Sequence, residues 1–141
     1  VLRAILEQEA PITEKYATRR LANHWGIRRV GRKVEQAAGI TIRQIARKDF
    51  AEMRGDSLWL ADQELDRVRI PDPEDADGQS KRDLLTDVPD AELDMAIVKL
   101  SESGLKGEDL ISATSRLFGN RRTGSSLNNH IGKRIEELRN T

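Results

Sequence analysis

Gly26-Ile27-Arg28-Arg29-Val30-Gly31 is the stretch that decides the fold, because it recurs as Gly119-Asn120-Arg121-Arg122-Thr123-Gly124. The two copies lie 93 positions apart, and we call them the first and second arginine corners. The same offset places Trp25 over Phe118, Val34 over Leu127 and Ile12 over Leu105. A match that includes the preceding aromatic residue and apolar residues on both sides indicates an internal duplication.

Each corner predicts a tight junction between two helices. The first glycine is typical of a residue that ends a helix in the left-handed conformation. The second opens the next helix with little side-chain bulk, which we expect to allow close helix–helix approach. Apolar spacing predicts helices over about 13–24 and from about Gly31 onward in the first copy, and over about 108–118 and 125–139 in the second. The pattern therefore predicts tandem helix-turn-helix units.

The two units differ in what surrounds the corner. Residues 1–8 have the pattern of a further helix, and short apolar runs at 50–53 and 58–60 flank Arg54-Gly55-Asp56-Ser57, which indicates a β-hairpin. Helix, helix, hairpin is the order of a winged helix. In the second unit a helix from about Pro89 precedes the corner, and the chain gives no sign of a wing.

The predicted fold is therefore mainly α with a small β-hairpin. We expect a winged-helix-like unit over residues 1–61, an exposed acidic linker over 62–82, and a wingless three-helix unit over 83–141. With 37% hydrophobic residues in a chain of 141, both cores are thin, so the two units could pack as one domain.

The charge is neutral overall but unevenly distributed. Residues 1–60 hold 12 basic and 7 acidic residues, residues 61–100 hold 5 and 12, and residues 101–141 hold 7 and 5. Two basic blocks thus flank an acidic middle. Local charge, rather than the net charge of zero, bears on a polyanionic partner.

The basic and polar residues of the corners are the candidate nucleic-acid-binding residues. In a helix-turn-helix, the N-terminal end of the second helix meets phosphates and base edges. Arginine, lysine, serine and asparagine are the residue types that make such contacts. The candidates are Arg28, Arg29, Arg32, Lys33 and Arg43 in the first unit, and Arg121, Arg122, Ser125, Asn128 and Lys133 in the second.

Other site classes have little support. The chain has no cysteine, and His24 and His130 stand apart from any ligand cluster, so we expect no metal site. Ser125 and Ser126 have no neighbouring base, so we predict no catalytic residue, no cofactor and no enzymatic activity. No apolar run is long enough to cross a membrane, and no signal peptide is visible, which favours a cytoplasmic protein without membrane contact. The chain starts within an apparent helix at Val1, which suggests a piece of a longer protein.

The aromatic residues are few, so each is expected to matter for packing. Trp25 and Phe118 each end a predicted helix, and we expect both in the core. Trp59 lies in the predicted hairpin, where packing is favoured over a role as a base-stacking platform.

Several motifs together resemble a bacterial domain family of unknown function. They are the runs 9–12 (EAPI) and 21–26 (LANHWG), the first corner, Leu58-Trp59-Leu60, 67–69 (RVR), and 117–124, which contains the second corner. That family lies at the C-terminus of large bacterial proteins that combine a superfamily I helicase core with a restriction-endonuclease-like domain. The resemblance covers nearly the whole chain. It implies an accessory module beside ATP-driven DNA or RNA handling, and it carries over no catalytic residue.

Two functions follow as expectations. The first is a non-catalytic accessory domain that binds nucleic acid, with DNA favoured. The alternative is a protein-interaction module that docks on the rest of the parent chain, with the corner arginines paired to Glu35 or to the acidic linker. The two functions are distinguished by whether the corner arginines are exposed or are buried against the acidic linker. The sequence predicts no particular oligomeric state.

Overall fold

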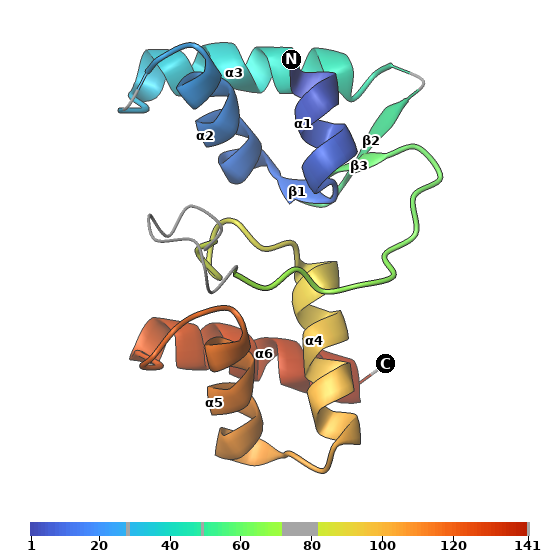
Figure 1. The fold of residues 1–141 in the computed structure, drawn as a ribbon, viewed down its shortest axis with the longest axis vertical. Coiled ribbons are helices and arrows are strands. Elements are labelled where there is room, and N and C mark those ends of the chain that lie inside the picture. The colour runs from blue at the N-terminus through green and yellow to red at the C-terminus, as the bar shows by residue number, and fades with distance from the viewer. Residues whose placement is uncertain (28, 49, 72–81, 141) are drawn as a thin grey trace. The chain divides into compact units, whose positions relative to one another are not determined.

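The computed structural model describes residues 1–27, 29–48, 50–71 and 82–140. The chain divides into two compact units, Val1–Glu64 (unit 1) and Leu65–Thr141 (unit 2). The described part is mainly helical, with six helices and one three-stranded antiparallel sheet (Figure 1). The expectation of a mainly α chain with a small β element is confirmed.

Unit 1 combines three helices with the sheet. Its elements are α1 (Leu2–Glu9), β1 (Ile12–Thr13), α2 (Glu14–His24), α3 (Arg32–Ile45), β2 (Ala51–Arg54) and β3 (Ser57–Leu60). The strand order is β1-β3-β2, and Leu58 of the central strand lies opposite both Ile12 and Met53. Buried residues of all three helices and of the sheet form one core: Leu2, Ile5, Leu6, Ile12, Tyr16, Ala17, Ile42, Ala51 and Leu58.

Local signals explain these elements. The Thr13 hydroxyl accepts the Tyr16 N–H at 3.2 Å and caps α2, as its position predicts. The predicted hairpin is present, and Gly55 has φ +63° at the first position of its two-residue turn, where glycine is favoured. The carbonyl of Asp56 in that turn accepts the Glu14 N–H at 2.8 Å, so the hairpin is fastened to the start of α2.

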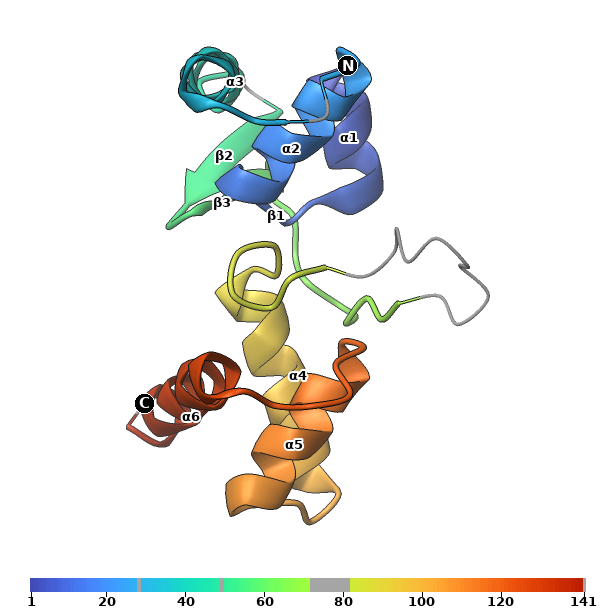
Figure 2. The ribbon, with the colours of Figure 1, turned by 90° about the vertical axis from the view of Figure 1, so that its left-hand side faces the viewer.

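Unit 2 is a three-helix arrangement of α4 (Asp90–Glu102), α5 (Gly107–Leu117) and α6 (Ser125–Arg139). Helix α6 packs against α4 and α5; it runs across them in Figure 1 and is seen nearly end-on beside them in Figure 2. Phe118 is 1% exposed and is among the largest fully buried side chains. Arg134 of α6 donates two hydrogen bonds to Asp94 of α4, at 2.9 and 2.7 Å, and this pairing raises the pKa of Arg134 above its ordinary value.

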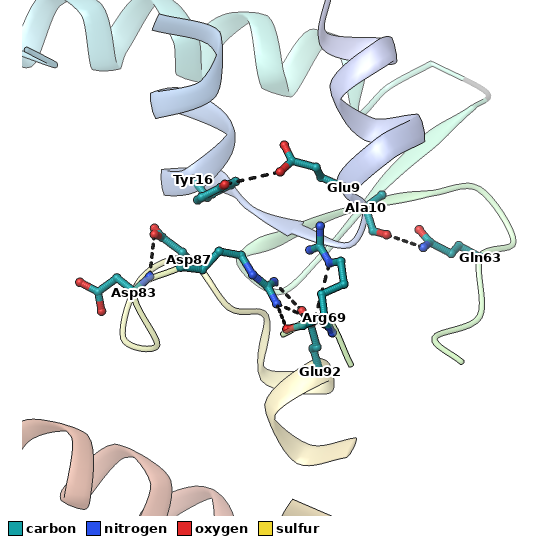
Figure 3. Close-up of polar contacts among 9 residues, drawn as sticks. Glu9, Ala10, Tyr16, Gln63, Arg69, Asp83, Asp87 and Glu92 are labelled. Atoms are coloured by element: carbon teal, nitrogen blue, oxygen red, sulfur yellow. Dashed lines mark hydrogen bonds and ion pairs between the residues drawn. The ribbon is translucent and has the colours of Figure 1, made fainter. Parts of the chain in front are cut away.

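The chain before α4 also belongs to unit 2. Val68 packs against its core, and Arg82, 6% exposed, forms a buried ion pair with Glu92 of α4. Arg69 binds the same carboxylate (Figure 3). The stretch 62–82, which the sequence suggests is a linker, therefore contributes packed residues at both of its ends, while residues 72–81 lie outside the described part of the chain.

Candidate nucleic-acid interface

The two corners have the same backbone geometry. Helices α2 and α5 begin and end 93 residues apart, and so do the starts of α3 and α6. Gly26 has φ +78° and Gly119 has φ +95°, so both adopt the left-handed conformation expected of a glycine that ends a helix. The Ile27 N–H donates to Ala22 O at 2.9 Å, and the equivalent Asn120 N–H donates to Ser115 O at 3.1 Å.

The second glycine of each corner has a different role from the one expected. Gly31 and Gly124 are the N-cap residues of α3 and α6, with extended backbones. A Cβ added at either would meet no atom within 4 Å, so the expectation that these glycines allow close helix approach is wrong. Neither cap provides a side-chain hydrogen bond, in contrast to Thr13 at α2. The first N–H groups of α3 and α6 therefore have no capping side chain.

The difference between the two glycines of a corner can be measured. We expect Gly26→Ala to lower the free energy of unfolding of unit 1 by about 1–2 kcal/mol, because an L-residue is strained at positive φ. Gly31→Ser should leave it unchanged or raise it by a few tenths of a kcal/mol, because serine is a better N-cap. Urea denaturation followed by tryptophan emission reports on unit 1, which contains both tryptophans. Equal losses in the two variants would contradict this assignment.

Most of the candidate residues lie at or just before the N-terminal ends of α3 and α6, whereas Arg43 lies in the last turn of α3. In unit 1, Arg29 precedes α3, Arg32 and Lys33 form its first turn, and all three are exposed. Arg43 is also exposed, but its Nε donates to Gly39 O at 3.1 Å, so its side chain lies back along α3. Arg28 lies outside the described residues.

The second corner presents its candidates in the same way. Arg121 and Arg122 precede α6, Ser125 and Asn128 occupy its first turn, and Lys133 lies two turns along. All five are exposed. The first turn of α6 has no acidic residue, whereas that of α3 has Glu35.

The exposed corner arginines are not neutralised within the described ranges. There, the ion-paired arginines are Arg3, Arg20, Arg54, Arg69, Arg82 and Arg134. No described carboxylate, Glu35 included, pairs with Arg29, Arg121 or Arg122. The acidic run at 72–77 lies outside the described residues, so its pairing with the corners stays a prediction.

Of the two tryptophans, Trp59 is buried as predicted and Trp25 is not. Trp25 is 46% exposed, so the prediction that it lies in the core is wrong, whereas its counterpart Phe118 is buried as predicted. In unit 1 the sheet supplies core residues that unit 2 lacks, which leaves less need for a large side chain at the end of α2. Trp59 is 6% exposed and lies under the Arg54 guanidinium, 4.4 Å from the ring centroid, which confirms its packing role.

Metal centres and membrane spans are the two other site classes on which the described residues bear. Among the described residues, no group of three or more histidine, aspartate or glutamate side chains lies together as a metal site would require. No described helix combines the length and the hydrophobicity needed to cross a membrane.

Part of the chain matches a known family. Residues 1–36 match the model of a protein family of unknown function, DUF3320. The matched stretch covers α1, β1, α2, the first corner and the start of α3. This supports the coarser part of the resemblance seen in the sequence, namely a domain family without an assigned function. Neither the curated proteins nor the solved structures gave a match to the chain.

Proposed function

We propose that this chain is a non-catalytic module that binds nucleic acid, with DNA favoured, through its two arginine corners. One observation carries the proposal. The same corner occurs twice, and each time exposed arginines stand beside the uncapped N-terminus of a helix.

The chemistry of such an end suits a phosphate group. A helix N-terminus carries partial positive charge and free N–H donors, so it attracts anions. A guanidinium group adds a full charge and can hold a phosphate with two hydrogen bonds. The N-cap residues of α3 and α6 are glycines. No cap side chain therefore occupies the first N–H groups of either helix.

We further propose that unit 1 is a winged helix and that α3 is its recognition helix. The element order α1-β1-α2-α3-β2-β3 and the strand order β1-β3-β2 support this. The Asp56 carbonyl in the hairpin turn accepts a hydrogen bond from the start of α2. Arg54 of the hairpin is paired with Glu52, so α3 offers more unpaired cationic groups than the hairpin does. In unit 2, α6 would take the same role, with Ser125 and Asn128 able to reach base edges.

The setting that we propose is cytoplasmic, as an accessory part of a larger bacterial protein with a helicase core and a restriction-endonuclease-like domain. The resemblance described from the sequence supports it, and the match over residues 1–36 agrees at the level of a family of unknown function.

The test is a titration of a labelled duplex of about two helical turns, followed by fluorescence anisotropy. We expect binding at low salt, and a Kd that rises at least tenfold in the variant Arg29→Ala/Arg122→Ala. Between about 50 and 200 mM salt, the slope of log K against log salt should decrease in magnitude by about 2, because each lost phosphate contact removes about 0.9.

The matched control is Lys15→Ala/Lys106→Ala. These lysines are exposed and lie at or just before the start of α2 and α5, the ends opposite the corners. The control removes the same charge, so it should change the affinity and the slope far less. Absence of binding at low salt, or equal effects of the two variants, would refute the proposed interface.

A further inference from the structure

Trp25 is an exposed aromatic ring at a place where the duplicated unit has a buried one. Trp25 and Phe118 are the C-cap residues of α2 and α5 and precede the left-handed glycine in each corner. Phe118 is 1% exposed and Trp25 is 46% exposed. The shared backbone geometry allows a buried ring at this position, but the core of unit 1 does not bury Trp25 and its ring is open to a ligand.

The sequence that follows Trp25 is basic and includes the exposed apolar residue Val30. Arg29, Arg32 and Lys33 follow within eight residues and are exposed, and residues 25–34 contain no acidic residue. Val30 is 38% exposed. The cation–π contacts found in the described residues involve Phe50, Tyr16 and Trp59, so the Trp25 ring has no such partner there.

An exposed ring beside several free cations is the combination that holds unpaired nucleotides. Bases stack on an aromatic side chain while basic groups follow the phosphates. The bases of a duplex already stack on one another, so the ring selects for a single-stranded segment. The second corner has no exposed ring at the equivalent position and would contribute only polar and cationic contacts to phosphates and base edges.

Resting on the proposed function, we propose that the first corner, besides contacting duplex phosphates, binds an unpaired single-stranded segment. An unpaired base stacks on Trp25, and the adjacent phosphates contact Arg29, Arg32 and Lys33. A duplex with a single-stranded extension should then bind more tightly than a blunt duplex, because stacking on Trp25 adds to the phosphate contacts.

Tryptophan emission tests this directly, because Trp25 is the exposed one of the two tryptophans. An oligothymidine strand should quench the emission of the wild-type chain and leave that of Trp25→Phe, which reports on Trp59, nearly unchanged. Trp25→Ala should weaken binding of the strand about 5- to 100-fold. Trp25→Phe should recover part of this loss, and the tailed duplex should bind more tightly than the blunt one.

The outcomes separate this inference from the proposed function. If Trp25→Ala weakens strand and blunt duplex equally, or weakens neither, the stacking role fails while the duplex test with Arg29 and Arg122 still stands. If no nucleic acid binds, both fail. If sedimentation shows that the wild type self-associates and Trp25→Ala does not, the ring binds a second copy of the chain and the inference is overturned. Circular dichroism checks that each variant is folded.

Discussion

We expect Glu92→Ala to lower the free energy of unfolding of unit 2 by about 3–5 kcal/mol, because it leaves a buried guanidinium group without its counter-charge. Glu92 is 0% exposed and Arg82 is 6% exposed. A loss of this size is comparable to the whole stability of many small domains, so unit 2 should be largely unfolded at moderate temperature.

The geometry shows why this carboxylate matters. Arg82 donates from Nη1 to Oε2 and from Nη2 to Oε1 of Glu92, both at 2.7 Å. The Arg69 N–H donates to Oε1 at 2.8 Å, and Arg82 Nη2 also donates to the Arg69 carbonyl at 2.9 Å. Glu92 thus fastens two segments, one on each side of residues 72–81, to the first turn of α4 (Figure 3).

The measurement can resolve the two units separately. Both tryptophans lie in unit 1, whereas helices occur in both units. In Glu92→Ala, the far-ultraviolet circular dichroism should show an early loss of helix. The urea midpoint of the tryptophan emission should stay close to that of the wild type.

A double variant tests the physical reason. Arg82→Met/Glu92→Leu removes both charges and keeps apolar volume, so it should recover part of the lost stability, although the Arg69 N–H and carbonyl lose their partners. If Glu92→Ala remains within about 1 kcal/mol of the wild type, the ion pair is not what holds these segments.

The helices and the corners could be predicted from the sequence because their signals are local. The spacing of Leu93, Ala96 and Ile97 places them on one face of α4, and all three are buried. Gly26 and Gly119 stop their helices as glycines in the left-handed conformation do. These features depend on residues within a few positions of one another.

The buried ion pair could not be predicted in the same way. Glu92 lies beside the inward-facing Leu93, but a glutamate in a helix is usually solvent-exposed. Its partner Arg82 is ten residues away, across the turn that contains Asp83 and Asp87. The position of Glu92 next to the apolar face of α4 was the one sequence signal for its burial. That position does not identify Arg82 as its partner.

The environment of Trp25 could not be predicted from the internal repeat. The repeat aligns Trp25 with Phe118 and predicts the same environment for both. The environment depends on the rest of each core, and Ile12 and Leu58 of the sheet occupy the core of unit 1. For the candidate interface, the sequence thus predicted the basic residues, and their exposure and the exposed ring came from the structure.

An aspartate at the N-cap of α3 and of α6 should raise the stability of each unit and lower the affinity for nucleic acid. We expect Gly31→Asp/Gly124→Asp to stabilise each unit by about 0.5–1 kcal/mol, because aspartate is a favourable N-cap and its charge suits the helix dipole. Both positions have extended backbones and open space around a Cβ, so the side chain fits. The same variant should raise the Kd for the tailed duplex about 100-fold, or about 2.7 kcal/mol. The new carboxylates would accept the helix N–H groups and repel the phosphates.

The control places the same charges at the other ends of the same helices. Gln44 lies near the end of α3 and Asn140 caps the end of α6, and both are exposed. Gln44→Glu/Asn140→Asp should cost a few tenths of a kcal/mol, because negative charge is unfavourable at a helix C-terminus. It should change the Kd much less than the glycine variant does. If the glycine variant is more stable and binds as tightly as the wild type, the helix ends are ordinary N-termini and the nucleic acid binds elsewhere. Opposite changes in stability and affinity, confined to the N-terminal variant, would instead show that the glycine caps keep these N–H groups available at a cost in stability.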